Sequence, residues 1–315
     1  MRKAILTLIL AVGSLNNLNA QDVRGAEDVA PSATGWGMES ANVVSAAKPA
    51  ATKNGIIYHG GPVMRGNSVN VYFIWYGDWM SGPLDSDSQS TVDLISALFA
   101  RVGGIGGSGY FRINTTYSGV SGSVTGNVGL AASTTDYYSK GKRLTDASVK
   151  SIVSKAITTK ALPKDSNAIY FVLSTSDVDE TSGFCTKYCG WHNHATISGS
   201  DIKFAFVGNS DRCRSACEAQ QFSPNGNSGA DAMASVMAHE AAEIVTDPQL
   251  NAWYDAKGNG NADKCGWSYG PVKGVMGKGA YNQTFSGYNW LLQMIWENTR
   301  GGGCVQTVGG QFYAH

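Results

Sequence analysis

The chain has 315 residues, with 24 basic and 24 acidic side chains and a formal net charge of zero. Charged residues make up 15% and hydrophobic residues 43%, so the chain can bury a core and is not a disordered polypeptide. The balanced charge also argues against nucleic acid as a partner, because binding to phosphates needs a basic surface.

The N-terminus predicts export. Met1-Arg2-Lys3 is basic, an apolar run follows at residues 4–12, and Ala20 is a small residue suited to cleavage after it. This pattern is typical of a secretory signal peptide at residues 1–20, although a buried N-terminal helix is the alternative. The apolar run is shorter than the roughly 20 residues that cross a membrane. We therefore expect a secreted, extracellular protein with no membrane span.

Residues 21–55 are polar and small, with no hydrophobic period, which predicts a flexible leader or propeptide-like segment. Residues 56–315 then read as one domain. The hydrophobic patterns predict strands at residues 69–76, 110–117, 123–130, 168–173 and 202–207, helices at 90–102, 145–158 and 231–246, and a last apolar element at 288–296. This alternation predicts an α/β (α+β) domain with a mixed, mostly buried sheet packed against helices.

Six cysteines lie in the second half of the chain. An even number in an exported protein favours disulfide bonds over a Cys₄ zinc site, and zinc sites more often have a two-residue gap between cysteines. The sequence does not determine the pairing. The cysteines are Cys185, Cys189, Cys213, Cys217, Cys265 and Cys304.

The helix predicted at residues 231–246 contains an HExxE pattern. His239 and Glu243 are four residues apart, so they lie on one face of the helix, and both side chains can bind zinc. Glu240 occupies the position that holds the general base in HExxH metalloproteases. Replacing the second His by Glu adds negative charge, which weakens selectivity for zinc over harder divalent cations.

A catalytic metal site needs a third protein ligand. Asp263 is our first choice, because it follows Glu243 by 20 residues, enough for the chain to turn at Pro248 and return. Asp247 and Asp255 are the alternatives. A buried ion-pair network without a metal could also explain the acidic helix.

His192 and His194 follow Cys189. Either could bind the metal or a substrate, but we interpret both as partly exposed loop residues.

From Tyr58 onward the chain resembles the EXORDIUM, or phosphate-induced protein, family. The matching pieces follow the family order over most of the chain and include 69–77 (VNVYFIWYG), 183–192 (GFCTKYCGWH), 251–254 (NAWY) and 262–265 (ADKC). The resemblance implies an extracellular protein, linked in plants to growth and to the carbon or phosphate response. It implies no particular reaction, and the HExxE helix suggests a bacterial-type member.

Taken together, we predict a secreted, zincin-like metal-dependent hydrolase, acting on a polypeptide substrate as a monomer. His239, Glu243 and Asp263 would bind the metal, with Zn²⁺ as the expected ion, and Glu240 would be the catalytic base.

The alternative is a non-catalytic extracellular protein that binds a cell-wall component, a glycan or a protein. Aromatic rings that stack on sugars would support it; the candidates are Trp75, Trp79, Trp191, Trp253 and Trp267. A closed structural metal site is a third possibility.

Overall fold

The computed structural model describes residues 55–274, 277–299 and 301–313. The predicted signal peptide, and the predicted leader apart from Gly55, lie outside these residues. Among the described helices, none combines the length and the apolar character needed to cross a membrane.

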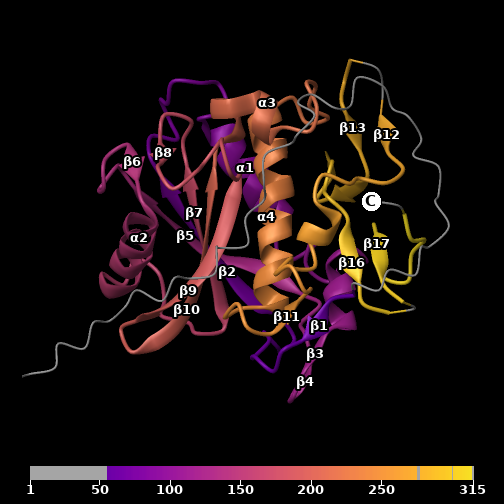
Figure 1. The fold of residues 1–315 in the computed structure, drawn as a ribbon. Coiled ribbons are helices and arrows are strands. Elements are labelled where there is room, and N and C mark those ends of the chain that lie inside the picture. The colour runs from indigo at the N-terminus through magenta and orange to yellow at the C-terminus, as the bar shows by residue number, and fades with distance from the viewer. Residues whose placement is uncertain (1–54, 275–276, 300, 314–315) are drawn as a thin grey trace, which may run out of the picture.

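A five-stranded sheet forms the centre of the fold (Figure 1). Four neighbouring strands run parallel, and the fifth, at one edge, is antiparallel to its neighbour. In spatial order they are β5 (Val128–Asp136), β2 (Val69–Tyr76), β7 (Ala168–Ser174), β10 (Ser200–Gly208) and β9 (Gly190–Ile197).

The inner strands β2, β7 and β10 are almost wholly buried. Strands that are covered on both faces have continuous apolar sequences, and such sequences predicted these three strands. The predictions at residues 69–76, 168–173 and 202–207 are confirmed, with the third strand longer at both ends.

Helices cover both faces of the sheet. Figure 1 shows α2 (Asp146–Thr158) on one side, and α1 (Gln89–Leu98) and α4 (Ser228–Thr246) on the other. The Thr145 side chain accepts a hydrogen bond from Ser148 N and caps α2, as its sequence predicts. The α1 helix ends before the predicted residue 102, and α4 begins three residues before the predicted Asp231.

The C-terminal part of the chain lies against the side of α4 that faces away from the sheet (Figure 1). It includes short two-stranded pairs and the 3₁₀ turn η3 (Asp263–Cys265). The pairs are β12 (Lys273–Gly274) with β13 (Ala280–Tyr281), β14 (Gln283–Phe285) with β15 (Tyr288–Trp290), and β16 (Ile295–Glu297) with β17 (Gly303–Val305).

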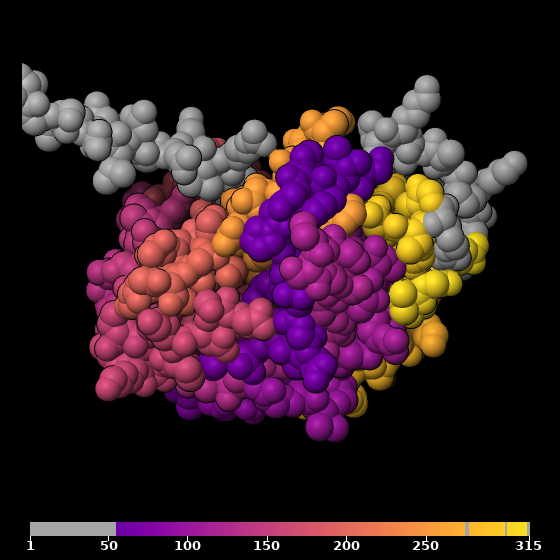
Figure 2. Space-filling model, turned by 90° about the horizontal axis from the view of Figure 1, so that it is seen from below, coloured from indigo at the N-terminus to yellow at the C-terminus, as the bar shows by residue number. Residues whose placement is uncertain are grey.

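The remaining elements are short. In the view from below, the first described residues, which include β1, lie on the surface, and the C-terminal part of the chain lies to one side of them (Figure 2). These elements are β1 (Ile57–Tyr58) with β11 (Trp253–Tyr254), β3 (Ser118–Gly119) with β4 (Gly122–Ser123), β6 (Arg143–Leu144) with β8 (Asp179–Glu180), η1 (Phe111–Thr116), η2 (Ser210–Cys213) and α3 (Arg214–Cys217).

Three sequence predictions of elements are wrong or incomplete. The predicted strand at residues 110–117 is instead the 3₁₀ helix η1 (Phe111–Thr116). The Thr115 and Thr116 hydroxyls donate to carbonyls three residues earlier, which stabilises this tight helix. The strand predicted at 123–130 begins only at Val128 and continues to Asp136. The last apolar element is divided between β15 and β16.

Disulfide bonds, rather than a Cys₄ zinc site, join the six cysteines. Two bonds tie the segment before β9 to η2 and α3, and the third ties η3 to β17. They are Cys185–Cys213, Cys189–Cys217 and Cys265–Cys304. Disulfides are typical of exported proteins and agree with the predicted secretion.

Candidate metal centre

Helix α4 carries the HExxE residues through the middle of the molecule, between the sheet and the C-terminal part. Asn227 caps its N-terminus by accepting from Ala230 N, and the helix ends before Pro248. His239, Glu240 and Glu243 are each at most 1% exposed. Three ionisable groups are therefore enclosed on one stretch of helix, which is costly unless they are compensated.

His239, Glu243 and Asp263, the three metal ligands expected from the sequence, lie close together. His239 Nε2 lies 3.3 Å from Glu243 Oε2 and 3.3 Å from Asp263 Oδ1. Asp263 is brought to the helix by η3 and is 15% exposed, so it forms the most accessible side of the group. One donor atom from each of the three residues lies within 4.8 Å of the other two.

Backbone groups hold both carboxylates in place. Glu243 Oε1 accepts hydrogen bonds from Ala262 N at 3.0 Å and Asp263 N at 2.8 Å, and Asp263 Oδ2 accepts from Gly260 N at 3.1 Å. The second oxygen of each carboxylate is the one that faces His239 Nε2. The oxygens that could bind a cation are thus oriented by the loop that carries Asp263.

The other side of the His239 ring contacts Gln293. His239 Nδ1 lies 3.4 Å from Gln293 Oε1, which also accepts from Trp267 N at 2.8 Å. A metal-binding His commonly donates its second ring N–H to an oxygen in this way, which fixes the ring orientation.

Charge interactions among the three residues shift the pKa values of two of them. Burial disfavours the charged imidazole, but the carboxylates of Glu243 and Asp263 outweigh it and raise the pKa of His239 well above its usual value. Burial, followed by repulsion from Asp263, raises the pKa of Glu243. Positive charge at the centre of the group would relieve both effects.

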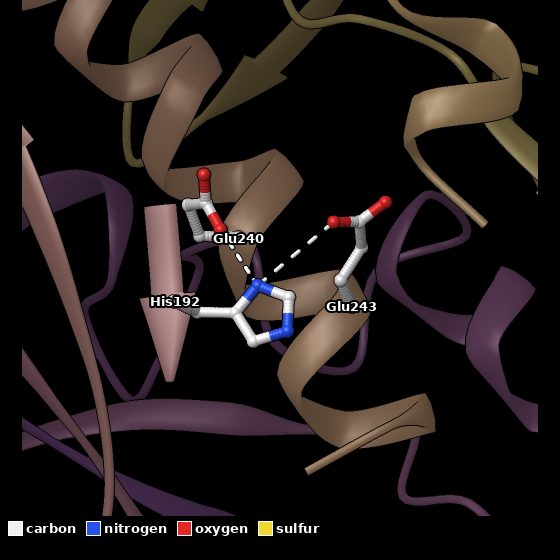
Figure 3. Close-up of side chains that lie close together, drawn as sticks. All are labelled: His192, Glu240 and Glu243. Carbon is white, nitrogen blue, oxygen red and sulfur yellow. Dashed lines mark hydrogen bonds and ion pairs between the residues drawn. The ribbon is translucent and has the colours of Figure 1, made fainter. Parts of the chain in front are cut away.

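Sequence reasoning missed His192. It lies in β9, is 1% exposed, and its Nδ1 is 2.9 Å from Glu240 Oε2 and 3.9 Å from Glu243 Oε2 (Figure 3). Burial is the main reason that its pKa falls to about 3, so its ring is neutral. The interpretation of His192 as an exposed loop residue is wrong; His194 also lies in β9 but is 33% exposed.

A hairpin signal could have found β9. Ser198 and Gly199 separate β9 from β10 and both have positive φ, at 50° and 78°. A two-residue loop of this kind, between a run that ends in Thr196-Ile197 and the next apolar run, is typical of a β-hairpin.

The two alternative ligands do not reach the centre. Asp247 Oδ1 accepts from Asn251 N and Ala252 N after the helix end, and Asp255 forms an ion pair with Lys264 at 3.0 Å. Both carboxylates stabilise the chain that leaves α4.

Of the tryptophans considered for glycan binding, three are buried and two are half-buried. The buried ones are Trp75, Trp79 and Trp191, and the half-buried ones are Trp253 and Trp267.

These features define an α/β protein with a candidate metal centre, and the comparisons with known proteins identify its family. The conserved region of phosphate-induced protein 1 matches residues 56–301, so the chain belongs to this family, as the resemblance to EXORDIUM proteins predicted. No comparison tests the expectation of a bacterial-type member.

Relatives in Arabidopsis thaliana agree with this assignment. Protein EXORDIUM-like 3 is 33% identical over 275 residues, which cover 76% of this chain and 80% of the relative. Protein EXORDIUM-like 5 is 31% identical over 274 residues, covering 76% of this chain and 74% of the relative. No solved structure matches the chain significantly.

Proposed function

We propose that this protein is a secreted metal-dependent hydrolase, with a divalent cation held by His239, Glu243 and Asp263. The observation that carries the proposal is the placement of His239 Nε2 at 3.3 Å from an oxygen of each acid. Two ligands of a tetrahedral zinc ion, at about 2.1 Å from it, lie roughly 3.4 Å apart. His239 Nε2 is therefore spaced from each acid as two ligands of one small cation are, and one donor atom of each residue lies within 4.8 Å of the other two.

The lack of other compensation for these groups supports a cation. His239 Nε2 and Glu243 Oε2 are both buried and lie 3.3 Å apart, but among the described residues neither atom has a partner with good hydrogen-bond geometry. Over the same residues, Glu243 and Asp263 form ion pairs only with histidine. A buried carboxylate oxygen without a donor is costly, and metal coordination removes that cost.

The donor set favours hydrolytic chemistry. One imidazole and two carboxylates are all zinc ligands, and three protein ligands leave a fourth position for water or substrate, as in catalytic zinc sites. A cation bound here would supply Lewis acidity to a carbonyl oxygen and would make water a better nucleophile. Zn²⁺ is the first candidate, although two carboxylates also suit harder divalent cations.

Glu240 is the residue that we assign as general base. It precedes Glu243 by three residues on α4, and a shared neighbour, His192, links their carboxylates. Its carboxylate would take a proton from water while the water oxygen bonds to the carbonyl carbon of a peptide. The same proton would pass to the leaving nitrogen as the C–N bond breaks. This is the zincin-like peptidase reaction that the HExxE pattern predicts.

Metal content and hydrolysis together test the proposal. The purified protein, loaded with Zn²⁺ and desalted, should retain one ion per chain, and His239→Ala should lose it. Casein hydrolysis should vanish with a chelator and return with added Zn²⁺. Glu240→Gln should keep the ion and lose hydrolysis by about 100-fold or more, in line with the loss of a general base. If Glu240→Gln cleaves casein as fast as wild type, the assignment of the base is wrong.

A second candidate is a non-catalytic extracellular protein with a structural cation. The burial of Glu240, which has no exposed surface, and its hydrogen bond to His192 favour this candidate. It predicts a bound ion but no hydrolysis of casein. Retention of the protein on cell-wall glycan by both the wild type and His239→Ala would then support a binding role independent of the cation.

A further inference from the structure

His192 contacts Glu240 from a different layer of the fold. Glu240 lies on α4, whereas His192 lies in β9, the antiparallel edge strand of the sheet. Figure 3 shows the imidazole reaching from the strand to the two carboxylates on the helix. Its Nδ1 is 2.9 Å from Glu240 Oε2, a normal hydrogen-bond distance. Because an ionised carboxylate only accepts hydrogen bonds, the His192 ring donates from Nδ1 to Glu240 Oε2.

The packing of β9 on α4 makes this contact possible. Gly190, two residues before His192, lies so close to α4 that a Cβ there would be 2.5 Å from Val236 Cγ1 and 3.0 Å from Phe206 O. Only a residue without a side chain allows the strand to approach the helix this closely. The position of His192 relative to Glu240 is thus set by the backbone of a regular strand, not by a loop.

His192 is placed as a partner of Glu240 more than as a further ligand. Its Nδ1 is 3.9 Å from Glu243 Oε2, longer than the 3.3 Å from that oxygen to His239 Nε2. The same nitrogen is engaged by Glu240. The His192 ring therefore lies beside the three proposed ligands and orients Glu240.

We propose that His192 is a positioning residue for the general base, holding Glu240 Oε2 so that Oε1 receives the proton of the attacking water. The inference rests on the proposed hydrolase function and adds to it a residue outside the HExxE helix. Without the Nδ1–H donor, Glu240 Oε2 loses the hydrogen bond that orients it towards His192, and the fraction of molecules with a correctly aimed Oε1 falls. The loss affects the chemical step and not the binding of substrate or cation.

Two substitutions at His192 test the role, with a matched control. His192→Leu removes the donor and retains an apolar side chain, whereas His192→Asn places an amide N–H near the position of Nδ1. His194→Leu is the control, because His194 lies in the same strand but its Nδ1 contacts Asp201 rather than Glu240. Zn²⁺ content, melting temperature, kcat and KM for a peptide substrate are measured for each variant.

We expect His192→Leu to keep one Zn²⁺ per chain and an unchanged KM while kcat falls by about 10- to 100-fold, part of what a general base contributes. His192→Asn should recover most of kcat, and His194→Leu should match wild type. A merely structural role would lower the melting temperature and would not be rescued by Asn.

The outcomes separate this inference from the proposed function. If wild type does not hydrolyse peptides, the hydrolase proposal fails. If wild type is active and His192→Leu is equally active, the positioning role alone is overturned. If His192→Leu loses Zn²⁺, or if His192→Asn is as slow as His192→Leu, His192 does not act by donating to Glu240.

Discussion

Gly190 lies against Val236 with no room for a side chain: a Cβ at residue 190 would be 2.5 Å from Val236 Cγ1. This contact joins the edge strand of the sheet to the middle of α4. It places His192 on one side of the helix, while η3 places Asp263 within reach of His239. Residues of the candidate centre therefore come from the sheet (β9), from helix α4 and from η3 in the C-terminal part of the chain.

Gly190→Ala should destabilise the protein by about 1–3 kcal/mol, because the added methyl group overpacks the contact between β9 and α4. Urea unfolding measures this change. Gly55→Ala is the control, since a Cβ at Gly55 meets no atom within 4 Å. Equal stability of the two variants would show that the strand can shift away from the helix at no cost.

Asp263→Asn should weaken Zn²⁺ binding by about 100-fold or more, since loss of an outer partner alone costs roughly 10- to 100-fold. Asp247→Asn and Asp255→Asn should bind Zn²⁺ as wild type does, because their carboxylates bond to other groups. Titration with a competing chelator gives the three affinities. A loss of binding in Asp255→Asn but not in Asp263→Asn would reverse our assignment of the third ligand.

The sequence predicts the inner strands, and the closeness of His239 to Glu243, because the signals for both are local in the chain. An apolar run identifies β2, and the spacing of His239 and Glu243 fixes their common face. His192 was beyond this reasoning, since its partner Glu240 is 48 residues away and only the packing of β9 on α4 joins them. The same holds for Gln293, a polar residue within an apolar segment whose role appears only beside the His239 ring.

Gln293→Leu should weaken Zn²⁺ binding by about 10- to 100-fold without removing it, which is the usual cost of losing the partner of a metal-binding His. The Gln293 amide oxygen accepts hydrogen bonds from the His239 ring N–H and from Trp267 N, and leucine has no acceptor to replace it. The chelator titration used for Asp263→Asn measures the change. Gln249→Leu is the control, because Gln249 bonds Asp201 instead. An unchanged affinity in Gln293→Leu would show that the ring needs no orienting partner.

Stability should fall as the pH rises through the neutral range, partly because of Glu218. Burial, followed by the neighbouring Asp211, raises the pKa of Glu218 from 4.5 to about 8. Between these pH values the folded state binds the Glu218 proton more tightly than the unfolded state does. The contribution of Glu218 to the free energy of unfolding is therefore fully present below pH 4.5 and lost by pH 8.

Glu218→Gln should therefore reduce the decline in unfolding free energy between pH 5.5 and 8.5, by on the order of a few kcal/mol. Urea unfolding of wild type and Glu218→Gln at both pH values, without added cation, measures this decline. Asp231, whose pKa burial raises to about 6, contributes a smaller decline of the same sign, which Asp231→Asn should remove. A decline in Glu218→Gln as large as in wild type would contradict the assignment to Glu218.

The Cys265–Cys304 disulfide should support the cation site as well as the fold. It ties η3, which begins with Asp263, to β17, and closes a segment of 39 residues. Replacing both cysteines by serine should cost about 2–4 kcal/mol of stability. It should also weaken Zn²⁺ binding, because the turn that orients the Asp263 and Glu243 carboxylates is no longer held. The matched control replaces Cys185 and Cys213, whose bond closes 28 residues near η2. That variant should lose stability but keep its Zn²⁺ affinity, and an equal loss of affinity in both would mean that only global stability supports the site.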